Sequence, residues 1–423
     1  MRLGIYSVSS QSGRAFFADM MNKGHEVYGY ARESEHGREF VDAVTFSRGI
    51  FLERPRNLNK EPSIFVSLYG ESKVGHDIKK LIDFSEVIYI ALPSNHIFDA
   101  VEKLKEAGIT EKKIPIIVAP PRSFATPYIW QILGDGYPVV SYSTCPYSCK
   151  APSPDVALIK LRKRTWYASL EGNFTKAQES LVKSIFAKAV YNTEPFTTTL
   201  GNIGAVFHPA TYLYNYEEIK KAEDEGRTFS FYIEGIANRP EVGEKLEAID
   251  QVRLQIADRL GFKTYGLKAD PREEEWAKMT EAMYSGEAAA TEDITILRKI
   301  RHDCMAAIGD AICSTLHWLD YTYGVRRQVG ESLSSAIGRT PNYQQLSVPQ
   351  TRYVTEDIPG SLVPLAAFAR RLGIDASPMD EVIELADKYF EINKQAPVYR
   401  DLQDFSDEYL ISYLKGEFFQ ITD

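Results

Sequence analysis

The first thirty residues constrain the fold of this chain more than any other stretch. Residues 3–8, Leu-Gly-Ile-Tyr-Ser-Val, form a largely apolar run that predicts a buried strand. A small polar turn follows at 9–13, and the apolar periodicity of residues 14–23 predicts a helix that ends at Gly24. Residues 26–30 predict a second strand. This order is the opening of a Rossmann-type βαβ unit, whose turn lets a phosphate approach the helix N-terminus.

The turn departs from the usual glycine-rich pattern. The pattern G-x-G-x-x-G would have glycine at positions 8, 10 and 13, where this chain has Val8, Ser10 and Gly13. Serine is small enough for a close approach, and its hydroxyl can bond a phosphate. A βαβ unit that binds no nucleotide is the alternative to this weak motif. We expect the turn to bind the cofactor through Ser9, Ser10, Gln11, Ser12 and Gly13.

The end of the second strand indicates which nucleotide is bound. NAD-binding units place an Asp or Glu here for the ribose hydroxyls, whereas this chain has Ala31, Arg32, Glu33 and Ser34. Ala31 removes the acid that would repel a 2′-phosphate, and Arg32 and Ser34 can bind that phosphate. We expect NADP(H) as the preferred cofactor, with NAD(H) second. A solvated surface arginine is the alternative for Arg32.

Alternating strands and helices continue to about residue 195. An apolar run at 86–92 is typical of a strand buried on both faces of a parallel sheet, and it ends in Pro93 and Ser94, which we expect to line the cofactor. The other strands expected are an edge strand at 64–68, strands at 114–119 and 139–144, and a terminal hairpin of 156–163 with 166–170. The other helices expected are 77–82, 97–107 and 175–188, with a loop at 53–63 and a turn at 145–150.

Helical periodicity replaces this alternation after Pro195. The helices expected are 212–225, 240–260, 294–319, 361–372 and 379–389, and the charged span 270–292 is interpreted as a solvated helix pair or lid. With 423 residues the chain is too long for one ordinary domain. We expect an α/β fold with an N-terminal Rossmann-type dinucleotide-binding domain (1–195) followed by an all-helical C-terminal substrate domain (196–423).

Composition and charge exclude several classes of partner. Hydrophobic residues make up 44% of the chain and charged residues 25%, an ordinary globular composition. The formal charge of −9 gives no basic footprint for nucleic acid or a membrane, so small-molecule partners are expected, with a homodimer as a further expectation. A strand pattern begins at once, with no signal peptide or membrane-length apolar run, so a cytoplasmic protein is expected. The four cysteines lack zinc-ligand spacing, so reduced thiols and no metal site are expected.

Two stretches far apart in the sequence carry the candidate catalytic groups. Residues 201–210 place His208 before a proline, which removes a backbone donor and disfavours helical geometry in the residue before it. We expect His208 at a bend at the head of a helix, where it would be an acid/base group. Residues 352–359 supply Arg352, which can grip a carboxylate, and Asp357, which can orient the histidine. A core histidine and a helix-capping aspartate are the alternatives.

The order of these parts resembles the octopine/nopaline (opine) dehydrogenase family. The resemblance rests on Asn-x-x-x-Val-x-His-Pro early in the helical half and on Arg-Tyr-x-x-Glu-Asp-x-Pro late in the chain, and it covers nearly the whole sequence. It implies that His208 is the general acid/base, that Asp357 is its carboxylate partner and that Arg352 anchors a substrate carboxylate. Asn202 would lie near the nicotinamide end of the cleft. The segment from about 265 to 330 is longer than in the compact members, which leaves the amino-acid substrate open.

The resemblance also implies a reaction. Enzymes of that family condense the amino group of an amino acid with a 2-oxo acid, such as pyruvate or 2-oxoglutarate, and reduce the imine with NAD(P)H to an N-(carboxyalkyl) amino acid. One alternative is a simple NADP-dependent hydroxy-acid dehydrogenase of the phosphogluconate-type superfamily, which needs no amine. The other is a non-catalytic nucleotide-binding protein, which the altered phosphate turn would suit. Cofactor oxidation with and without the amine distinguishes these readings.

Overall fold

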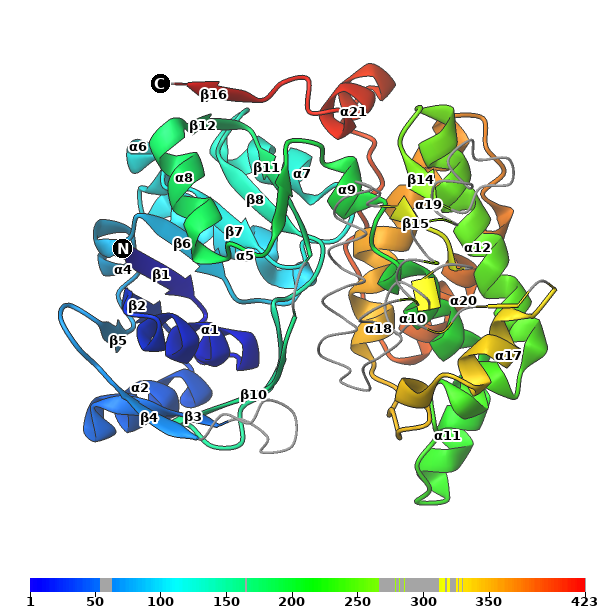
Figure 1. Cartoon of the computed structure of the whole chain (residues 1–423), viewed down its shortest axis with the longest axis horizontal. Helices are drawn as coiled ribbons and strands as arrows, with labels where there is room; N and C mark the ends of the chain where they lie inside the picture. The colour runs from blue at the N-terminus through cyan, green and yellow to red at the C-terminus, as the bar shows by residue number, and fades with distance from the viewer. Residues whose placement is uncertain are drawn as a thin grey trace. The chain divides into compact units, whose positions relative to one another are not determined.

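The computed structural model describes most of the chain as two compact units. The described residues are 1–53, 63–163, 166–265, 278, 281, 285, 312–315, 318–319, 325, 327–328 and 330–422. The first unit comprises Met1–Pro121, Ala125–Pro195 and Ser412–Asp423, and the second comprises Arg122–Phe124 and Phe196–Ile411 (Figure 1). Each unit therefore contains a short segment that lies far in sequence from its main part.

An eight-stranded sheet forms the centre of the first unit. Its order is β13 (Val190–Asn192), β11 (Tyr167–Glu171), β8 (Val139–Tyr142), β7 (Ile116–Val118), β6 (Val87–Ile90), β1 (Arg2–Tyr6), β2 (Glu26–Tyr30) and β5 (Lys73–Gly75). The strands from β8 to β5 are parallel, whereas β11 is antiparallel to β8. The chain leaves β1 toward β2 on one side and later returns to β6 on the other. Sheets with this switch bind ligands at the carboxyl ends of the strands on either side of it.

Helix α1 (Gln11–Asn22) is buried on almost every side because it packs against two sheets. It contacts β1 and β2 of the central sheet and also β3, β9 and β10 of a second sheet. Its apolar residues Phe16, Phe17, Met20 and Met21 are all buried, and the Phe16 ring stacks on Tyr89 of β6 at 4.2 Å between centroids. The position of its N-terminus, and of the turn before it, is thereby fixed.

The second sheet has the order β4 (Ile64–Ser67), β3 (Gly49–Glu53), β10 (Val156–Arg162) and β9 (Tyr147–Lys150). The expectation of a turn at 145–150 was wrong in part, because residues 147–150 pair antiparallel with β10. The predicted hairpin of 156–163 with 166–170 was also wrong. Strand β10 pairs with β9 and β3, and β11 pairs with β8 and β13, so the chain changes sheets between them. Ala157 and Ile159 of β10 are buried in the shared core, which accounts for the apolar pattern without a hairpin.

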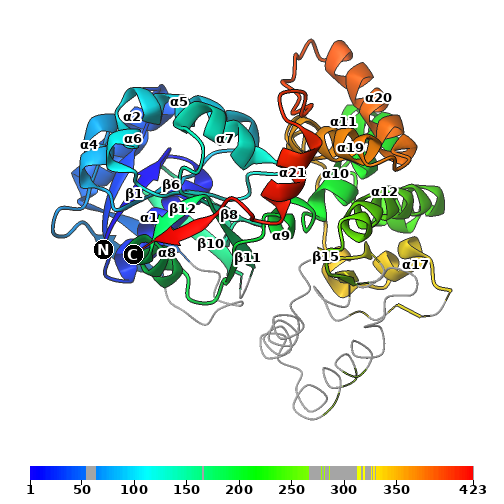
Figure 2. The same cartoon turned by 90° about the horizontal axis from the view of Figure 1, so that it is seen from above.

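The remaining helices of the first unit are α2 (Glu35–Ser47), α4 (Ile78–Phe84), α5 (Ile97–Glu106), α6 (Ile109–Lys112), α7 (Ala125–Leu133) and α8 (Lys176–Ile185). From Ser412 onward the end of the chain also belongs to this unit, with the last residues of α21 (Asp407–Leu414) and with β16 (Gln420–Thr422). Strand β16 pairs in parallel with β12 (Asn173–Thr175), and Figure 2 shows the two side by side. Helical periodicity after residue 195 did not indicate this return to the first unit.

The second unit consists mainly of helices around α12 (Pro240–Arg259). The others are α9 (Phe196–Thr199), α10 (Gly204–Tyr214), α11 (Tyr216–Asp224), α17 (Leu333–Gly338), α18 (Arg352–Thr355), α19 (Val363–Arg371) and α20 (Ser377–Ile392), with the 3₁₀ turn η3 (Pro341–Tyr343). Residues spaced three and four apart on α12 are buried, which lets it pack against α10, α17, α19 and α20. Two π-helical turns, η2 (Ile233–Ala237) and η4 (Ile358–Leu362), interrupt the α-helical pattern, and such turns are frequent at functional sites.

The helix predicted over 294–319 was wrong at residues 312–313, whereas the described residues Thr315, Trp318 and Leu319 are helical. Ile312–Cys313 is strand β15, paired in parallel with β14 (Thr264–Tyr265). Most of that prediction, most of the span 270–292 and Cys304 lie outside the described residues. Cys145, Cys149 and Cys313 carry reduced thiols. In the described part of the chain, no group of acidic, histidine or cysteine side chains could hold a metal ion. A search of the same residues finds no helix that could cross a membrane.

Candidate active site

The turn after β1 is organised by Ser10. Its side-chain oxygen accepts a hydrogen bond from Gly13 N at 3.0 Å, which caps α1, and its hydroxyl donates to the carbonyl of Ala91 at 2.8 Å. Ala91 directly follows β6, so one serine links the ends of the two strands that flank the switch in the sheet. Gln11 is exposed and Ser12 is half-buried beside it. The predicted turn residues thus lie where a dinucleotide phosphate would approach the helix N-terminus.

Gly13 is the one position of the turn that must lack a side chain. A Cβ built on it would lie 2.5 Å from the carbonyl oxygen of Ser7 and 2.8 Å from Cα of Val8. Ser7 adopts the left-handed region with φ of 65°, which lets the chain reverse immediately after β1. The glycines missing at positions 8 and 10 therefore leave the tight turn intact.

Two side chains that sequence reasoning missed hold Ser9. The Arg14 guanidinium is 1% exposed, donates from Nε to the Ser9 carbonyl at 2.9 Å and also bonds the Ser153 carbonyl. His36 Nε2 lies 3.0 Å from the same Ser9 oxygen. Burial lowers the pKa of Arg14, with Asp155 and Glu39 acting in the opposite direction. An arginine in an otherwise apolar helix segment was the available sequence signal.

The end of β2 is arranged by the N-terminus of α2. The Ser34 side chain accepts a hydrogen bond from Gly37 N at 3.2 Å and so caps this helix. Arg32 is exposed while Ala31 is buried, and a Cβ on Gly37 would lie 2.0 Å from the Arg32 carbonyl oxygen. The loop therefore presents an arginine side chain to solvent beside a capped helix N-terminus.

Pro93 and Ser94 follow β6. Pro93 is exposed, and Ser94 is 2% exposed at the start of the 3₁₀ turn η1 (Ser94–His96). Both belong to the same carboxyl edge of the sheet as the turn after β1. Their predicted role in lining the cofactor stays a prediction.

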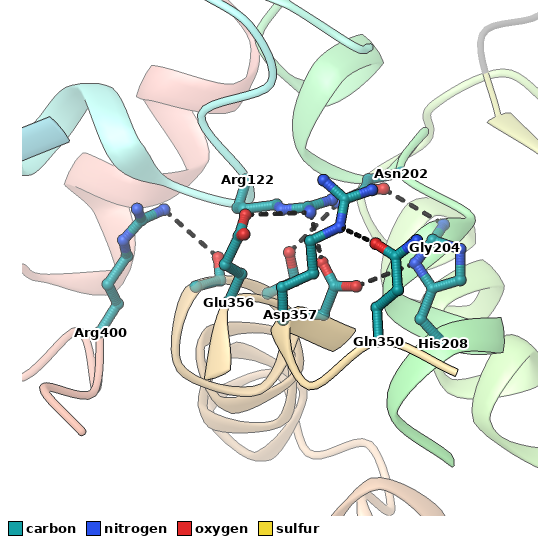
Figure 3. Close-up of polar contacts among 11 residues, drawn as sticks. Arg122, Asn202, Gly204, His208, Gln350, Glu356, Asp357 and Arg400 are labelled. Carbon is teal, nitrogen blue, oxygen red and sulfur yellow. Dashed lines mark hydrogen bonds and ion pairs between the residues drawn. The ribbon is translucent and has the colours of Figure 1, made fainter. Parts of the chain in front are cut away.

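His208 and Asp357 meet in the second unit. His208 Nδ1 lies 3.0 Å from Oδ2 of Asp357, and Figure 3 shows the two side chains facing each other. The histidine side chain is 25% exposed and that of Asp357 is 0% exposed. The carboxylate is thus fully withdrawn from water while the imidazole remains partly accessible, as an acid/base group must be.

The expected bend at His208 was wrong. His208 lies inside α10, with Pro209 as the next residue of the same helix. Proline at this position removes the hydrogen bond that its nitrogen would make to the carbonyl of Ala205. Helix α10 packs against α12, α18, α20 and η4, and this tertiary packing keeps it helical. The imidazole is therefore held by a rigid helix.

Asp357 does not act as a helix cap. It stands at the N-cap position of η4 but makes no capping hydrogen bond with its side chain. Its Oδ1 instead forms an ion pair of 2.8 Å with Nη2 of Arg122, and the same nitrogen lies 3.5 Å from Oε2 of Glu356 (Figure 3). No role was expected from the sequence for Arg122 or Glu356. The only local signal for Arg122 is a charged residue directly after Pro120 and Pro121 at the end of a buried strand.

Tyr353 and Arg352 complete the surroundings of His208. The Tyr353 ring stacks on the imidazole at 4.2 Å between centroids and 19° between planes. Burial raises the pKa of Tyr353, and the nearby Arg352 charge acts in the opposite direction. Arg352 is exposed, donates from Nε to Oε1 of Gln350 at 2.7 Å, and its Cζ lies 5.8 Å from the Tyr353 ring centroid. Its guanidinium is therefore near the histidine and accessible to an anion.

Asn202 has a structural position at the start of α10. Its Oδ1 accepts from Gly204 N at 3.2 Å, and its Nδ2 donates to the Ser361 hydroxyl at 3.2 Å. Asn202 is buried, and a Cβ on Gly204 would lie between Asn202 Oδ1 and the His208 ring, 3.1 Å and 3.3 Å away. The structure thus gathers all four predicted catalytic residues in one part of the second unit.

This arrangement can move a proton next to an anionic group. Asp357 engages Nδ1 of His208, which leaves Nε2 to exchange a proton with a ligand. Hydrogen positions follow from this pairing, because Nδ1 must carry a proton to donate to the carboxylate. Arg352 adds a cation that can bind a carboxylate through two parallel hydrogen bonds.

Known proteins share both the sequence pattern and the fold. Residues 192–293 and 273–390 match the model for the alpha-helical domain of NAD/NADP octopine/nopaline dehydrogenases. An opine dehydrogenase from Arthrobacter sp. (strain 1C) is 22% identical over 382 residues, covering 88% of this chain and 86% of the relative.

Solved structures extend the similarity over both units. Octopine dehydrogenase with NADH and L-arginine superposes with a TM-score of 0.66 at 14% identity, covering 92% of this chain and 90% of that one. Yersinopine dehydrogenase with NADP⁺ gives a TM-score of 0.57 at 12% identity, covering 99% and 98%. The predicted Rossmann-type unit followed by a helical region is confirmed. Residues 192–390 of this chain belong to the octopine/nopaline dehydrogenase family of NAD(P)-dependent oxidoreductases, which act on CH–NH groups.

Proposed function

We propose that this protein is an NADPH-dependent opine dehydrogenase. It joins the amino group of an amino acid to the carbonyl carbon of a 2-oxo acid, such as pyruvate or 2-oxoglutarate, and reduces the resulting imine to an N-(carboxyalkyl) amino acid. The observation that carries the proposal is the His208–Asp357 pair, 3.0 Å apart, with an accessible guanidinium on the neighbouring Arg352. A related octopine dehydrogenase is known with L-arginine, with pyruvate and with agmatine.

The side chains of the second unit have distinct roles in this reaction. Arg352 binds the carboxylate of the oxo acid, because its planar fork matches a carboxylate. His208 exchanges a proton at Nε2 with the reacting nitrogen or oxygen while Asp357 holds Nδ1. Asn202 fixes the start of α10 and so the position of the imidazole. Holding two substrates beside one acid/base group contributes through proximity.

The first unit fits a nicotinamide dinucleotide. Gly13 has no side chain and allows a close approach, and Ser10 caps the N-terminus of α1. Both features are suited to a pyrophosphate. Residues Ser9, Ser10, Gln11, Ser12, Gly13, Pro93 and Ser94 would hold the dinucleotide. Its nicotinamide supplies the hydride when bound.

The preference for NADPH rests on the end of β2. Arg32 is exposed there, no acid stands at Ala31, and Ser34 lies at the adjacent N-terminus of α2. We expect Arg32→Ala to weaken NADPH binding by about 1.5–3 kcal/mol, the range for hydrogen bonds to charged groups, with little change for NADH. Fluorescence titration measures both. Arg2→Ala is the control, because Arg2 is an exposed arginine at the start of β1, whereas the turn expected to bind the cofactor follows the end of this strand. Equal losses for both cofactors contradict the preference.

The test of the function is a two-substrate assay. NADPH oxidation is followed with a pool of amino acids and one 2-oxo acid, with each component omitted in turn. Mass spectrometry should find a product whose mass equals the sum of both substrates less one oxygen. Oxidation that proceeds without the amine and yields a hydroxy acid would identify a simple dehydrogenase instead. Cofactor binding without oxidation under every condition would identify a nucleotide-binding protein.

A further inference from the structure

We propose that Arg122 is a positioning residue which, together with Glu356, sets the pH range in which His208 transfers its proton. This inference rests on the proposed function, because it assumes that His208 is the acid/base group. Arg122 acts through Asp357. The ion pairs that the structure shows for Arg122 are with Asp357 and Glu356, and not with the imidazole. Its role is to compensate part of the negative charge of the buried Asp357 carboxylate, so that protonated His208 does not compensate all of it.

The two oxygens of Asp357 have different partners. Oδ1 pairs with Nη2 of Arg122 at 2.8 Å, and Oδ2 faces Nδ1 of His208 at 3.0 Å. Because this carboxylate is fully buried, its negative charge requires compensation by a neighbouring positive group. Arg122 can supply that compensation permanently, since a guanidinium does not lose its proton in a protein. Histidine can then gain or lose its proton without leaving the carboxylate unpaired.

Arg122 is held for this purpose by a segment fixed to the elements around the site. Ser123 N donates to the Gly360 carbonyl at 2.9 Å, and the Ser123 hydroxyl donates to the Thr199 carbonyl at 3.0 Å. Arg400 Nη1 donates to the carbonyl oxygens of Ser123 and Gly360 (Figure 3 labels Arg400). Residues 122–124 thus belong by their contacts to the second unit, although their sequence neighbours belong to the first.

Gly360 allows the stem of Arg122 to approach η4. A Cβ built on Gly360 would lie 3.2 Å from Cβ and 3.3 Å from Cγ of Arg122. Arg122 itself adopts φ of 70°, in the left-handed region that costs energy for a residue with a side chain. Its side chain is 11% exposed. A strained backbone and a closely packed stem both serve to bring this guanidinium to Asp357.

Glu356 opposes the effect of Arg122 on Asp357. Its carboxylate lies 3.5 Å from the same Nη2 atom and competes for the positive charge. Removing the Arg122 charge leaves two carboxylates to stabilise protonated His208, so the imidazole should hold its proton to higher pH. Removing the Glu356 charge has the reverse effect, because Arg122 then compensates Asp357 more completely. The two neutralising substitutions are therefore expected to act in opposite directions.

Several other charged groups around α10 are engaged elsewhere. Tyr353 of α18 stacks on the imidazole, and Arg352 lies over the Tyr353 ring. Five acidic groups of the other elements packed on α10 have basic partners: Glu234 of η2 with Arg227, Asp250 with Arg253 on α12, Asp380 and Glu381 of α20 with Arg370 and Lys245, and Glu218 of α11 with Arg239. Arg122 and Glu356 are thus the charges that bear directly on Asp357.

The test is the pH dependence of kcat/KM for NADPH-dependent condensation in four full-length variants. Arg122→Gln should move the midpoint of the limb that reports the His208 proton upward by about 0.5–1 pH unit, less than the 1–3 units expected of a charge in direct contact. Glu356→Gln should move it downward. Arg122→Lys should restore most of the wild-type midpoint, because it keeps the charge. Arg370→Gln, an exposed arginine paired with Asp380, is the control that should leave the profile unchanged.

Each remaining outcome decides the question. Shifts of Arg122→Gln and Glu356→Gln in the same direction, or no shift in either, overturn the proposal. A higher KM for the 2-oxo acid with an unmoved midpoint would show that Arg122 binds substrate directly and also overturns it. If circular dichroism shows that Arg122→Gln does not fold, Glu356→Gln and Arg122→Lys still test the predicted direction of the midpoint shift. Failure of the proposed function is a separate result, since wild-type protein would then show no amine-dependent oxidation.

Discussion

Glu171 and Asp357 are both completely buried, and these two carboxylates are stabilised in different ways. Glu171 on β11 of the first unit accepts hydrogen bonds from the hydroxyls of Ser169 and Tyr413, the latter at 2.7 Å. Asp357 in the second unit is paired with the Arg122 guanidinium and the His208 imidazole. Hydroxyls satisfy hydrogen bonds but supply no charge, whereas a guanidinium does. Burial accordingly raises the pKa of Glu171, with the hydroxyl groups around it acting in the opposite direction.

The difference separates a structural carboxyl group from the one that we propose to be catalytic. Glu171 holds Tyr413, and with it the returning C-terminal segment, to the central sheet. Proton exchange there would only weaken packing. Asp357 faces His208, which is partly exposed, so a bound ligand can exchange a proton with this histidine. We infer that charge compensation together with a partly exposed histidine partner, more than burial, distinguishes Asp357 from Glu171.

The largest expected effect is on the rate and concerns His208. His208→Ala should lower kcat by about 10²–10⁴-fold, the usual contribution of a general acid/base, while cofactor binding and the thermal midpoint change little. Steady-state kinetics, NADPH titration and thermal unfolding measure the three quantities. His25→Ala, at a half-buried histidine just before β2, is the matched control. A near-normal rate with a large loss of stability would make His208 a core residue and remove the contrast between the two carboxylates.

Arg352 should give the next largest effect. Arg352→Lys keeps the positive charge but loses the planar fork, and we expect the KM for the 2-oxo acid to rise by about 10- to 100-fold. The KM for the amino acid should change much less. Arg371→Lys is a suitable control, because this arginine bonds the Phe405 and Leu402 carbonyls away from His208. An equal rise in both KM values would indicate a general disturbance of the second unit.

The sequence predicts local features of both regions better than the contacts between distant segments. The turn at Ser10 and Gly13, the strand over 26–30 and the helices near 240–260 and 379–389 follow from neighbouring residues, and the structure contains them. The His208–Asp357 contact spans 149 residues, and it was expected from the chemistry of the two residue types and from a family resemblance. Local periodicity carries no information on such a pairing.

The missed features all depend on tertiary packing. Arg122 reaches Asp357 because Gly360 lacks a side chain and Ser123 bonds its carbonyl, a relation that no local pattern encodes. The strand β10 was assigned to the wrong partner because an apolar strand pattern does not specify its sheet. The bend predicted at His208 failed because packing around α10 outweighs the hydrogen bond lost at Pro209.

A third prediction tests the cofactor turn of the first unit, which contains no charge pair of its own. Gly13→Ala would force a Cβ to within 2.5 Å of the Ser7 carbonyl oxygen, and relief of this clash should cost about 1–3 kcal/mol in stability and cofactor binding together. NADH and NADPH should be affected alike, unlike in Arg32→Ala. Gly24→Ala is a control for glycine replacement nearby, since a Cβ there meets no atom within 4 Å, although its positive φ adds some strain. A variant with unchanged titration curves would show that the turn does not need the close approach.

The smallest expected effect concerns Glu171 and the dependence of stability on pH. The folded state holds the Glu171 proton more tightly than the unfolded chain, because burial raises its pKa above the ordinary 4.5. The stability that this group contributes is therefore fully present below about pH 4.5 and is lost as the pH rises through the raised value, by at most about 1.4 kcal/mol per pH unit. Glu171→Gln cannot ionise, so wild-type protein should lose stability relative to this variant as the pH is raised from 4.5. Urea unfolding of both proteins at several pH values measures the difference, with the exposed Glu111→Gln as control. A difference that stays constant with pH would mean that folding does not raise the pKa of Glu171, and the contrast between the two carboxylates would then fail.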